Sequence, residues 1–122
     1  LGNDAHAEAL TLIGDVKDRD VIIVDDEVDT GCSIAQAVNV AKQNGARDVY
    51  VAFVHAILSR NGAERLASLP IKHIITTDTA PLSPEKMSFL EGRITVLSVA
   101  PLLGEVIKRA HEGRSVGEMF NE

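Results

Sequence analysis

The sequence predicts an α/β protein with three layers, in which a mostly parallel sheet is flanked by helices. Residues 21–24, Val-Ile-Ile-Val, form an unbroken run of branched apolar side chains, which is typical of a strand buried on both faces. Apolar residues then recur at helical spacing up to Asn44-Gly45, and a second apolar run follows at residues 49–54. Strand, helix and strand in this order predict a right-handed βαβ unit. We therefore expect the strand at residues 21–24 to lie at the centre of the sheet.

The segment before that strand predicts one more element. Residues 10–16 form a short apolar run ending in Gly-Asp, which favours an edge strand antiparallel to the others. His6 lies upstream with no second His or Cys near it, so we interpret it as a solvated loop residue rather than a metal ligand.

After the second strand the pattern alternates between helix and strand. Pro81 and Pro84 predict an irregular turn after the third strand. The remaining elements are predicted as a short helix at residues 63–69, strands at 73–77 and 94–98, a long helix from Pro101 to Gly113, and a closing helical turn at 115–120.

Composition bounds the function. The 122 residues are enough for one domain or part of one, and 45% are hydrophobic. The net charge of −6 argues against a nucleic-acid or anionic-membrane partner, which would require a basic patch. A single Cys excludes an intrachain disulfide and fits a reducing cytoplasm. No run reaches the roughly 18 apolar residues of a membrane span. Because the chain begins with Leu1 rather than Met, we expect it to be part of something longer.

The most informative stretch follows the first strand. Residues 25–29 carry four carboxylates in five positions, and Thr30-Gly31-Cys32-Ser33 then opens the helix. Backbone N–H groups at a helix start and the positive end of the helix dipole favour a phosphate. Thr30 and Ser33 add hydroxyl donors, while carboxylates suit sugar hydroxyls or Mg²⁺. The loop is thus predicted to bind a phosphorylated sugar.

A simpler interpretation is a solvated acidic turn in which Ser33 or Asp29 caps the helix. We expect such capping in either case, but it explains one side chain and leaves three acids without a role. His55 ends the second strand at the same predicted edge, where it fits lining the site and packing against the turn equally well.

Residues 24–33, Val-Asp-Asp-Glu-Val-Asp-Thr-Gly-Cys-Ser, resemble the phosphoribosyl-diphosphate (PRPP) motif of type I phosphoribosyltransferases and PRPP synthetases. Four further stretches resemble the C-terminal domain of ribose-phosphate pyrophosphokinase, the PRPP synthetase family. They are Leu-Ile-Gly-Asp-Val at 12–16, Phe-Val-His-Ala at 53–56, Thr-Asp-Thr-Ala-Pro-Leu at 77–82, and the tail from 98 to 116. The resemblance covers nearly the whole chain.

The resemblance implies a phosphoribosyltransferase-like fold, with residues 1–122 forming one C-terminal domain of a longer chain truncated on its N-terminal side. It implies a kinase that transfers diphosphate from Mg-ATP to ribose 5-phosphate, giving PRPP for nucleotide biosynthesis. Asp25 and Asp26 would then address the ribose hydroxyls, and residues 29–33 the 5-phosphate: Asp29, Thr30, Gly31, Cys32 and Ser33. Cys32 stands where Gly or another small residue is usual in the family, and Ser33 where Thr is usual.

The same resemblance implies that the ATP site, the Mg²⁺-binding turn and a mobile basic loop lie upstream of this chain. We therefore expect no catalytic or metal-binding residues here and an inactive fragment. Around the acidic loop, the nearest basic residues in sequence are Arg19 before it and Lys42 after it. The complete enzyme is expected to be a cytoplasmic homo-oligomer, of the hexamer-of-dimers type known in the family.

Three alternatives remain at this stage. A phosphoribosyltransferase would use the same loop, but usually lacks the turn at residues 78–82. A non-catalytic regulatory paralogue would be favoured by altered loop acids, yet Asp25, Asp26 and Asp29 are all present. A flavodoxin-like or Rossmann module is disfavoured because no Gly-x-Gly-x-x-Gly follows any strand.

Overall fold

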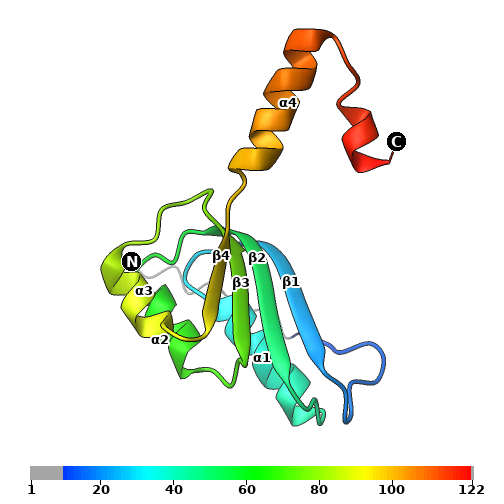
Figure 1. The fold of residues 1–122 in the computed structure, drawn as a ribbon. Coiled ribbons are helices and arrows are strands. Elements are labelled where there is room, and N and C mark those ends of the chain that lie inside the picture. The colour runs from blue at the N-terminus through cyan, green and yellow to red at the C-terminus, as the bar shows by residue number, and fades with distance from the viewer. Residues whose placement is uncertain (1–9, 122) are drawn as a thin grey trace, which may run out of the picture.

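The computed structural model describes residues 10–121, and these form a four-stranded parallel sheet in the order β1-β2-β3-β4 with helices along the chain (Figure 1). The strands are β1 (Val21–Val28), β2 (Val49–Ala56), β3 (His73–Thr77) and β4 (Ile94–Leu97). The helices are α1 (Cys32–Gln43), α2 (Gly62–Ser68), α3 (Pro84–Leu90), α4 (Ala100–Glu112) and the 3₁₀ turn η1 (Gly117–Phe120). The predicted α/β class is confirmed, with all four strands parallel.

The register brings the ends of β1 and β2 together. Asp25 lies opposite Phe53, and Glu27 lies opposite His55. Because the strands are parallel, the acidic segment and the end of β2 share the carboxyl edge of the sheet, where open α/β sheets bind ligands.

The core lies between the sheet and helices α1, α2 and α3, which cover one face of it (Figure 1). Its side chains are aliphatic apart from one phenylalanine. The largest contributions come from Val38 of α1, Val49, Val51 and Phe53 of β2, Leu66 of α2, Ile74 of β3 and Leu90 of α3.

The opposite face is not covered by any described residue. Ile22 and Val24 of β1 are 58% and 72% exposed there, and Leu97 of β4 is also exposed. The described part of the chain therefore shows two of the three predicted layers, with helices on one face of the sheet.

Two predictions about the N-terminal side are wrong. β1 lies at an edge of the sheet and not at its centre, since β2 alone pairs with it among the described residues. Apolar side chains on both faces of β1 predicted burial of both faces, but they carry no information about the order of the strands. The predicted strand at residues 10–16 is also absent, because Gly14 has φ 104° and the Asp15 carboxylate accepts the Lys17 N–H at 2.9 Å, which makes a turn. His6 lies outside the described residues.

The prediction of irregular structure around Pro84 is also wrong, because α3 begins there. Ser83 is the N-cap, and its side-chain oxygen accepts the Lys86 N–H at 3.3 Å. Pro84 follows in the first turn, where its missing N–H costs nothing. The capping signal Ser-Pro was present in the sequence, but the proline was interpreted as a helix breaker.

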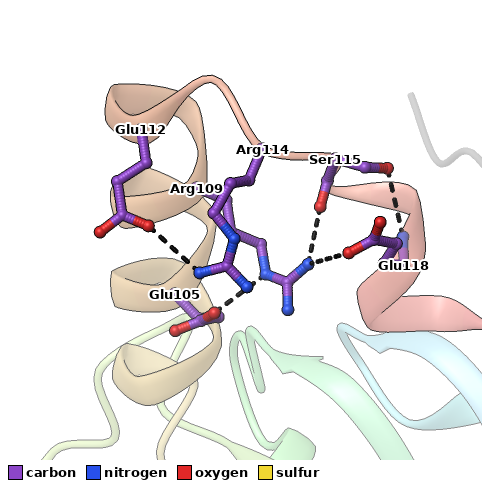
Figure 2. Close-up of polar contacts among 6 residues, drawn as sticks. All are labelled: Glu105, Arg109, Glu112, Arg114, Ser115 and Glu118. Carbon is purple, nitrogen blue, oxygen red and sulfur yellow. Dashed lines mark hydrogen bonds and ion pairs between the residues drawn. The ribbon is translucent and has the colours of Figure 1, made fainter.

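Helix α4 and η1 extend away from the sheet (Figure 1), and no residue of α4 is buried. Arg109 joins the two elements, as Figure 2 shows. Its guanidinium donates to the Glu105 carboxylate at 2.9 Å, to the Ser115 carbonyl at 2.8 Å and to Glu118 at 3.2 Å. One side chain therefore holds η1 beside α4, while Arg114 forms a separate ion pair with Glu112.

Candidate functional site

Three of the four clustered acids belong to a strand and not to a loop. β1 continues through the acidic segment to Val28, which is buried. The parallel ladder with β2 pairs Asp25 with Phe53 and Glu27 with His55. Burial alternates along β1 as far as Asp26, but Glu27 is exposed like Asp26 and the next residue, Val28, belongs to the core. Only Asp29 lies in the turn that leads to α1.

A hollow of about 160 Å³ lies at this turn. It is lined by six of the seven residues that the sequence predicted for the site: Asp25, Asp29, Thr30, Gly31, Cys32 and Ser33. Asp26 does not line it and is exposed. Glu27, which is not among those seven residues, also lines the hollow, and its side chain is exposed.

The first turn of α1 faces this hollow without a side-chain cap. Gly31 is the N-cap residue, with φ 77° and ψ 8°, and no described side chain accepts a hydrogen bond at the cap. The expectation that Ser33 or Asp29 caps the helix is therefore wrong. The first intrahelical bond runs from the Ala35 N–H to the Gly31 carbonyl at 2.9 Å. The N–H groups before Ala35 have no partner inside the helix, so the start of α1 keeps its donors and the positive end of its dipole for another acceptor.

The acids of β1 are organised by hydrogen bonds to neighbouring backbone. The Asp26 N–H donates to the Asp25 carboxylate and the Glu27 N–H to the Asp26 carboxylate, each at 2.9 Å. A hydrogen bond with the Asp25 carboxyl group, followed by the one from the Glu27 N–H, holds the pKa of Asp26 below its ordinary value. The lower pKa favours the carboxylate form, which is acceptor-only and suits hydroxyl groups as donors.

Sequence reasoning missed Arg65, which α2 brings next to the same turn. Its guanidinium donates to the Thr30 carbonyl and lies 3.1 Å from the Cys32 sulfur. The contact could not be predicted from local sequence, because Arg65 and Thr30 are 35 positions apart. The topology contained a signal, since a helix that follows β2 begins at the carboxyl edge where β1 also ends.

His55 lies at that edge but outside the hollow. Its Nδ1 is 2.8 Å from the hydroxyl of Thr79, and the Thr79 hydroxyl in turn donates to the Val54 carbonyl at 3.1 Å. The next residue back, Asp78, accepts the Val99 N–H at 2.9 Å, and this bond lowers the pKa of the Asp78 carboxyl. His55 and the turn at residues 78–82 thus connect the ends of β2, β3 and β4 rather than lining the hollow.

Over residues 10–121, no group of three or more His, Cys, Asp or Glu side chains comes close enough together to bind a metal ion. Within that same range, none of the helices has the length and apolar character needed to cross a membrane.

Fold and site together define a class: a parallel α/β domain in which an acidic strand leads directly into an uncapped helix start. Comparison with known proteins makes this class specific. The family described as "Phosphoribosyl synthetase-associated domain" matches residues 4–121.

Individual relatives agree with that family. The chain is 44% identical over 114 residues to a ribose-phosphate pyrophosphokinase of Caldanaerobacter subterraneus, covering 93% of this chain and 35% of the relative. It is 45% identical to the ribose-phosphate pyrophosphokinase of a Nostoc species, covering 93% and 34%. The crystal structure of phosphoribosylpyrophosphate synthetase from Mycobacterium smegmatis superposes with a TM-score of 0.78 at 40% identity, covering 83% of this chain and 33% of that one.

The chain belongs to the ribose-phosphate pyrophosphokinase (PRPP synthetase) family. It spans about a third of the length of the curated relatives that it matches.

Proposed function

We propose that this chain is the ribose 5-phosphate-binding part of a ribose-phosphate pyrophosphokinase. The observation that supports this most strongly is the uncapped start of α1, which opens onto a hollow bordered by carboxylates. A phosphate needs donors and positive potential, whereas sugar hydroxyls need acceptors, and the two ends of this hollow offer these two kinds of group.

Ribose 5-phosphate would bind in one orientation only, with its phosphate at the start of α1 and its ribose toward the carboxylates. Its 5-phosphate would accept hydrogen bonds from the N–H groups at the start of α1 and from the hydroxyls of Thr30 and Ser33. The ribose hydroxyls would donate to Asp25 and Asp26, as the family resemblance implies. The reverse orientation would bring the phosphate against several carboxylates, where like charges repel.

The remaining apparatus of the reaction is proposed to lie in the other two thirds of a longer protein. The described residues gather no ligand set that fits a resident Mg²⁺, so no step of the reaction is assigned to a metal held by this chain. Transfer of a diphosphoryl group also needs several cations around the phosphates. Among residues 10–121, Arg65 is the basic residue that forms hydrogen bonds with this turn. We therefore propose that ATP and Mg²⁺ bind elsewhere and that this chain alone binds ribose 5-phosphate without catalysing.

Assembly and location are proposals of the same kind. Leu102, Leu103 and Ile107 of α4 are large apolar side chains that are 45%, 55% and 69% exposed. Such a stripe supports burial against another protein surface, as in a homo-oligomer. The single cysteine supports a cytoplasmic location.

The binding proposal is tested by titrating the ¹⁵N-labelled chain with ribose 5-phosphate, and separately with ribose and with inorganic phosphate. We expect ribose 5-phosphate to shift the amide signals of residues 30–33 and to bind more tightly than either part alone. Gly31→Val should abolish the shifts, because a branched residue does not adopt φ 77° without strain. Glu27→Ala is the control that should leave them in place. Equal binding of ribose and ribose 5-phosphate, or shifts confined to other residues, would refute the proposal.

A further inference from the structure

Helix α2 begins directly behind the turn that carries the candidate site. Gly62, its first residue, lies so close that an added Cβ would be 2.6 Å from the Asp29 carbonyl oxygen. A Cβ on Gly31 would be 3.7 Å from Cδ of Arg65 and 3.8 Å from a methyl group of Leu66. The turn therefore has the hollow on one side and α2 on the other.

Arg65 provides the polar contacts between these two segments. One guanidinium nitrogen donates to the Thr30 carbonyl and contacts the Cys32 sulfur. The side chain is partly buried, and Arg65 is not among the residues that line the hollow. Its position indicates contact with the turn from behind rather than with a ligand in front.

This contact determines where one important donor points. The Thr30 carbonyl and the Gly31 N–H belong to the same peptide unit, which is planar and trans, so they point in opposite directions. Because the carbonyl points to Arg65, the Gly31 N–H points away from α2. Without a partner for the Thr30 carbonyl, a glycine at the next position would let this peptide unit rotate easily.

We propose that Arg65 is a positioning residue: by holding the Thr30 carbonyl and the Cys32 side chain, it fixes the turn at residues 29–33 so that its N–H groups are aligned for an anion before the ligand arrives. The effect on ligand affinity rests on the proposed function, whereas the effect on the order of the free turn does not. Alignment in advance strengthens binding because less freedom is lost when the ligand binds.

The experiment measures the free turn and the affinity separately. ¹⁵N relaxation order parameters and residual dipolar couplings of residues 29–33 are recorded on the ligand-free chain, and ribose 5-phosphate affinity is then measured by titration. The variants are Arg65→Met, which keeps much of the apolar stem, and Arg65→Lys, which keeps one charged donor. Gly62→Ala is a second perturbation: its added Cβ would clash with the Asp29 carbonyl oxygen, and the Arg65 side chain is unchanged. Arg19→Met removes the same charge before β1, at the opposite end of the strand, and serves as the control.

We expect the order parameters of residues 30–33 to fall in Arg65→Met from about 0.85 toward 0.6, with an altered N–H orientation at Gly31. Amides of β1 and β2 should be unchanged. Ribose 5-phosphate affinity should fall about tenfold, because a turn that has lost a hydrogen bond from a charged donor must be ordered when the ligand binds. Arg65→Lys should recover part of both losses, Gly62→Ala should disturb the turn, and Arg19→Met should change neither.

The outcomes separate the competing roles. A turn that stays equally ordered in Arg65→Met would overturn the proposal, and a lower affinity in that case would mean that Arg65 contacts the ligand directly. A loosened turn with unchanged affinity would show that Arg65 does not serve binding. If the native chain binds no ribose 5-phosphate, the proposed function fails, and the order parameters still decide whether Arg65 fixes the turn.

Discussion

At the scale of single residues, the end of β1 places neighbouring carboxylates in different surroundings. Asp25 is half-buried beside the hollow, Asp26 is exposed outside it, and Glu27 is exposed although it borders the hollow. Three neighbouring acids that look equivalent in the sequence are therefore not equivalent in the fold, because only Asp25 is both half-buried and part of the lining of the hollow.

Substitution should reveal this difference. We expect Asp25→Ala to weaken ribose 5-phosphate binding about tenfold or more, since a carboxylate–hydroxyl bond involves a charged acceptor. Glu27→Ala should have a much smaller effect, because the exposed side chain of Glu27 is well hydrated. Isothermal titration of both variants measures the two affinities, and equal losses would refute the role of Asp25.

The sequence predicted which residues line the hollow better than it predicted how they are arranged. Residues 29–33 were identified from their residue types and from the strand and helix around them. The uncapped helix start was not foreseen, because Ser33 and Asp29 are common capping residues and only the backbone of Gly31 shows that neither caps α1. Arg65 was missed because its contact with Thr30 depends on tertiary packing.

At the scale of elements, strong hydrophobic periodicity was a reliable guide. The strands at residues 49–54, 73–77 and 94–98 and the long C-terminal helix are confirmed to within a few residues. The errors occurred at proline and glycine, because each of these residues occurs both in irregular turns and at the ends of regular elements. Pro84 begins a helix, and Gly14, with φ 104°, belongs to a turn that was predicted as part of a strand.

The contribution of the core can be tested on two leucines of similar chemistry. Leu66 of α2 is fully buried between the sheet and the turn, while Leu103 of α4 is 55% exposed. Leu66→Ala should lower the free energy of unfolding by about 2–5 kcal/mol, because it removes buried methyl groups and leaves a cavity. Leu103→Ala should change it by about 0.5 kcal/mol or less. Urea denaturation gives both values, and a similar loss in the two variants would contradict the position of the core.

The contact between α4 and η1 should depend on pH. The hydrogen bond from Arg109 holds the pKa of Glu105 below its ordinary value, so the carboxylate form stabilises the folded arrangement. This stabilisation is fully present above the ordinary glutamate pKa and is lost as the pH falls through the lowered pKa of Glu105. Amide hydrogen exchange of η1 should therefore become faster, after correction for the intrinsic rate, as the solution is acidified.

Glu105→Gln is the matched control, since it removes the titrating group and keeps the side-chain volume. Its exchange should show a weaker dependence on pH than that of the native chain. An identical acid dependence in the two proteins would mean that Glu105 does not control this contact.

At the scale of the whole molecule, the described residues form one covered face and one bare face of a sheet. The sequence predicted both faces to be covered, and this expectation came from the apolar side chains of Ile22 and Val24. Strand order could not be predicted in the same way, because it depends on which segments pair beside β1. The ribose-phosphate pyrophosphokinase of Caldanaerobacter subterraneus is about three times as long as this chain, so members of this family contain further residues besides a domain of this kind.

The proposal that this chain binds ribose 5-phosphate while ATP and Mg²⁺ bind elsewhere has a direct consequence for activity. The 122-residue chain mixed with ribose 5-phosphate and Mg-ATP should form neither AMP nor PRPP at a measurable rate, because ATP and Mg²⁺ are proposed to bind elsewhere. A full-length ribose-phosphate pyrophosphokinase assayed in parallel provides the positive control. Turnover near that of the control would refute this proposal.

The central claim is that the turn between β1 and α1 binds the phosphate of a sugar phosphate, and a crystal structure of the chain with ribose 5-phosphate tests it most directly. We predict phosphate oxygens at about 2.7–3.2 Å from backbone nitrogens of residues 31–33, the range of N–H···O hydrogen bonds, with the ribose hydroxyls toward Asp25. A sugar phosphate bound in the opposite direction, or bound elsewhere while this turn stays empty, would contradict the account.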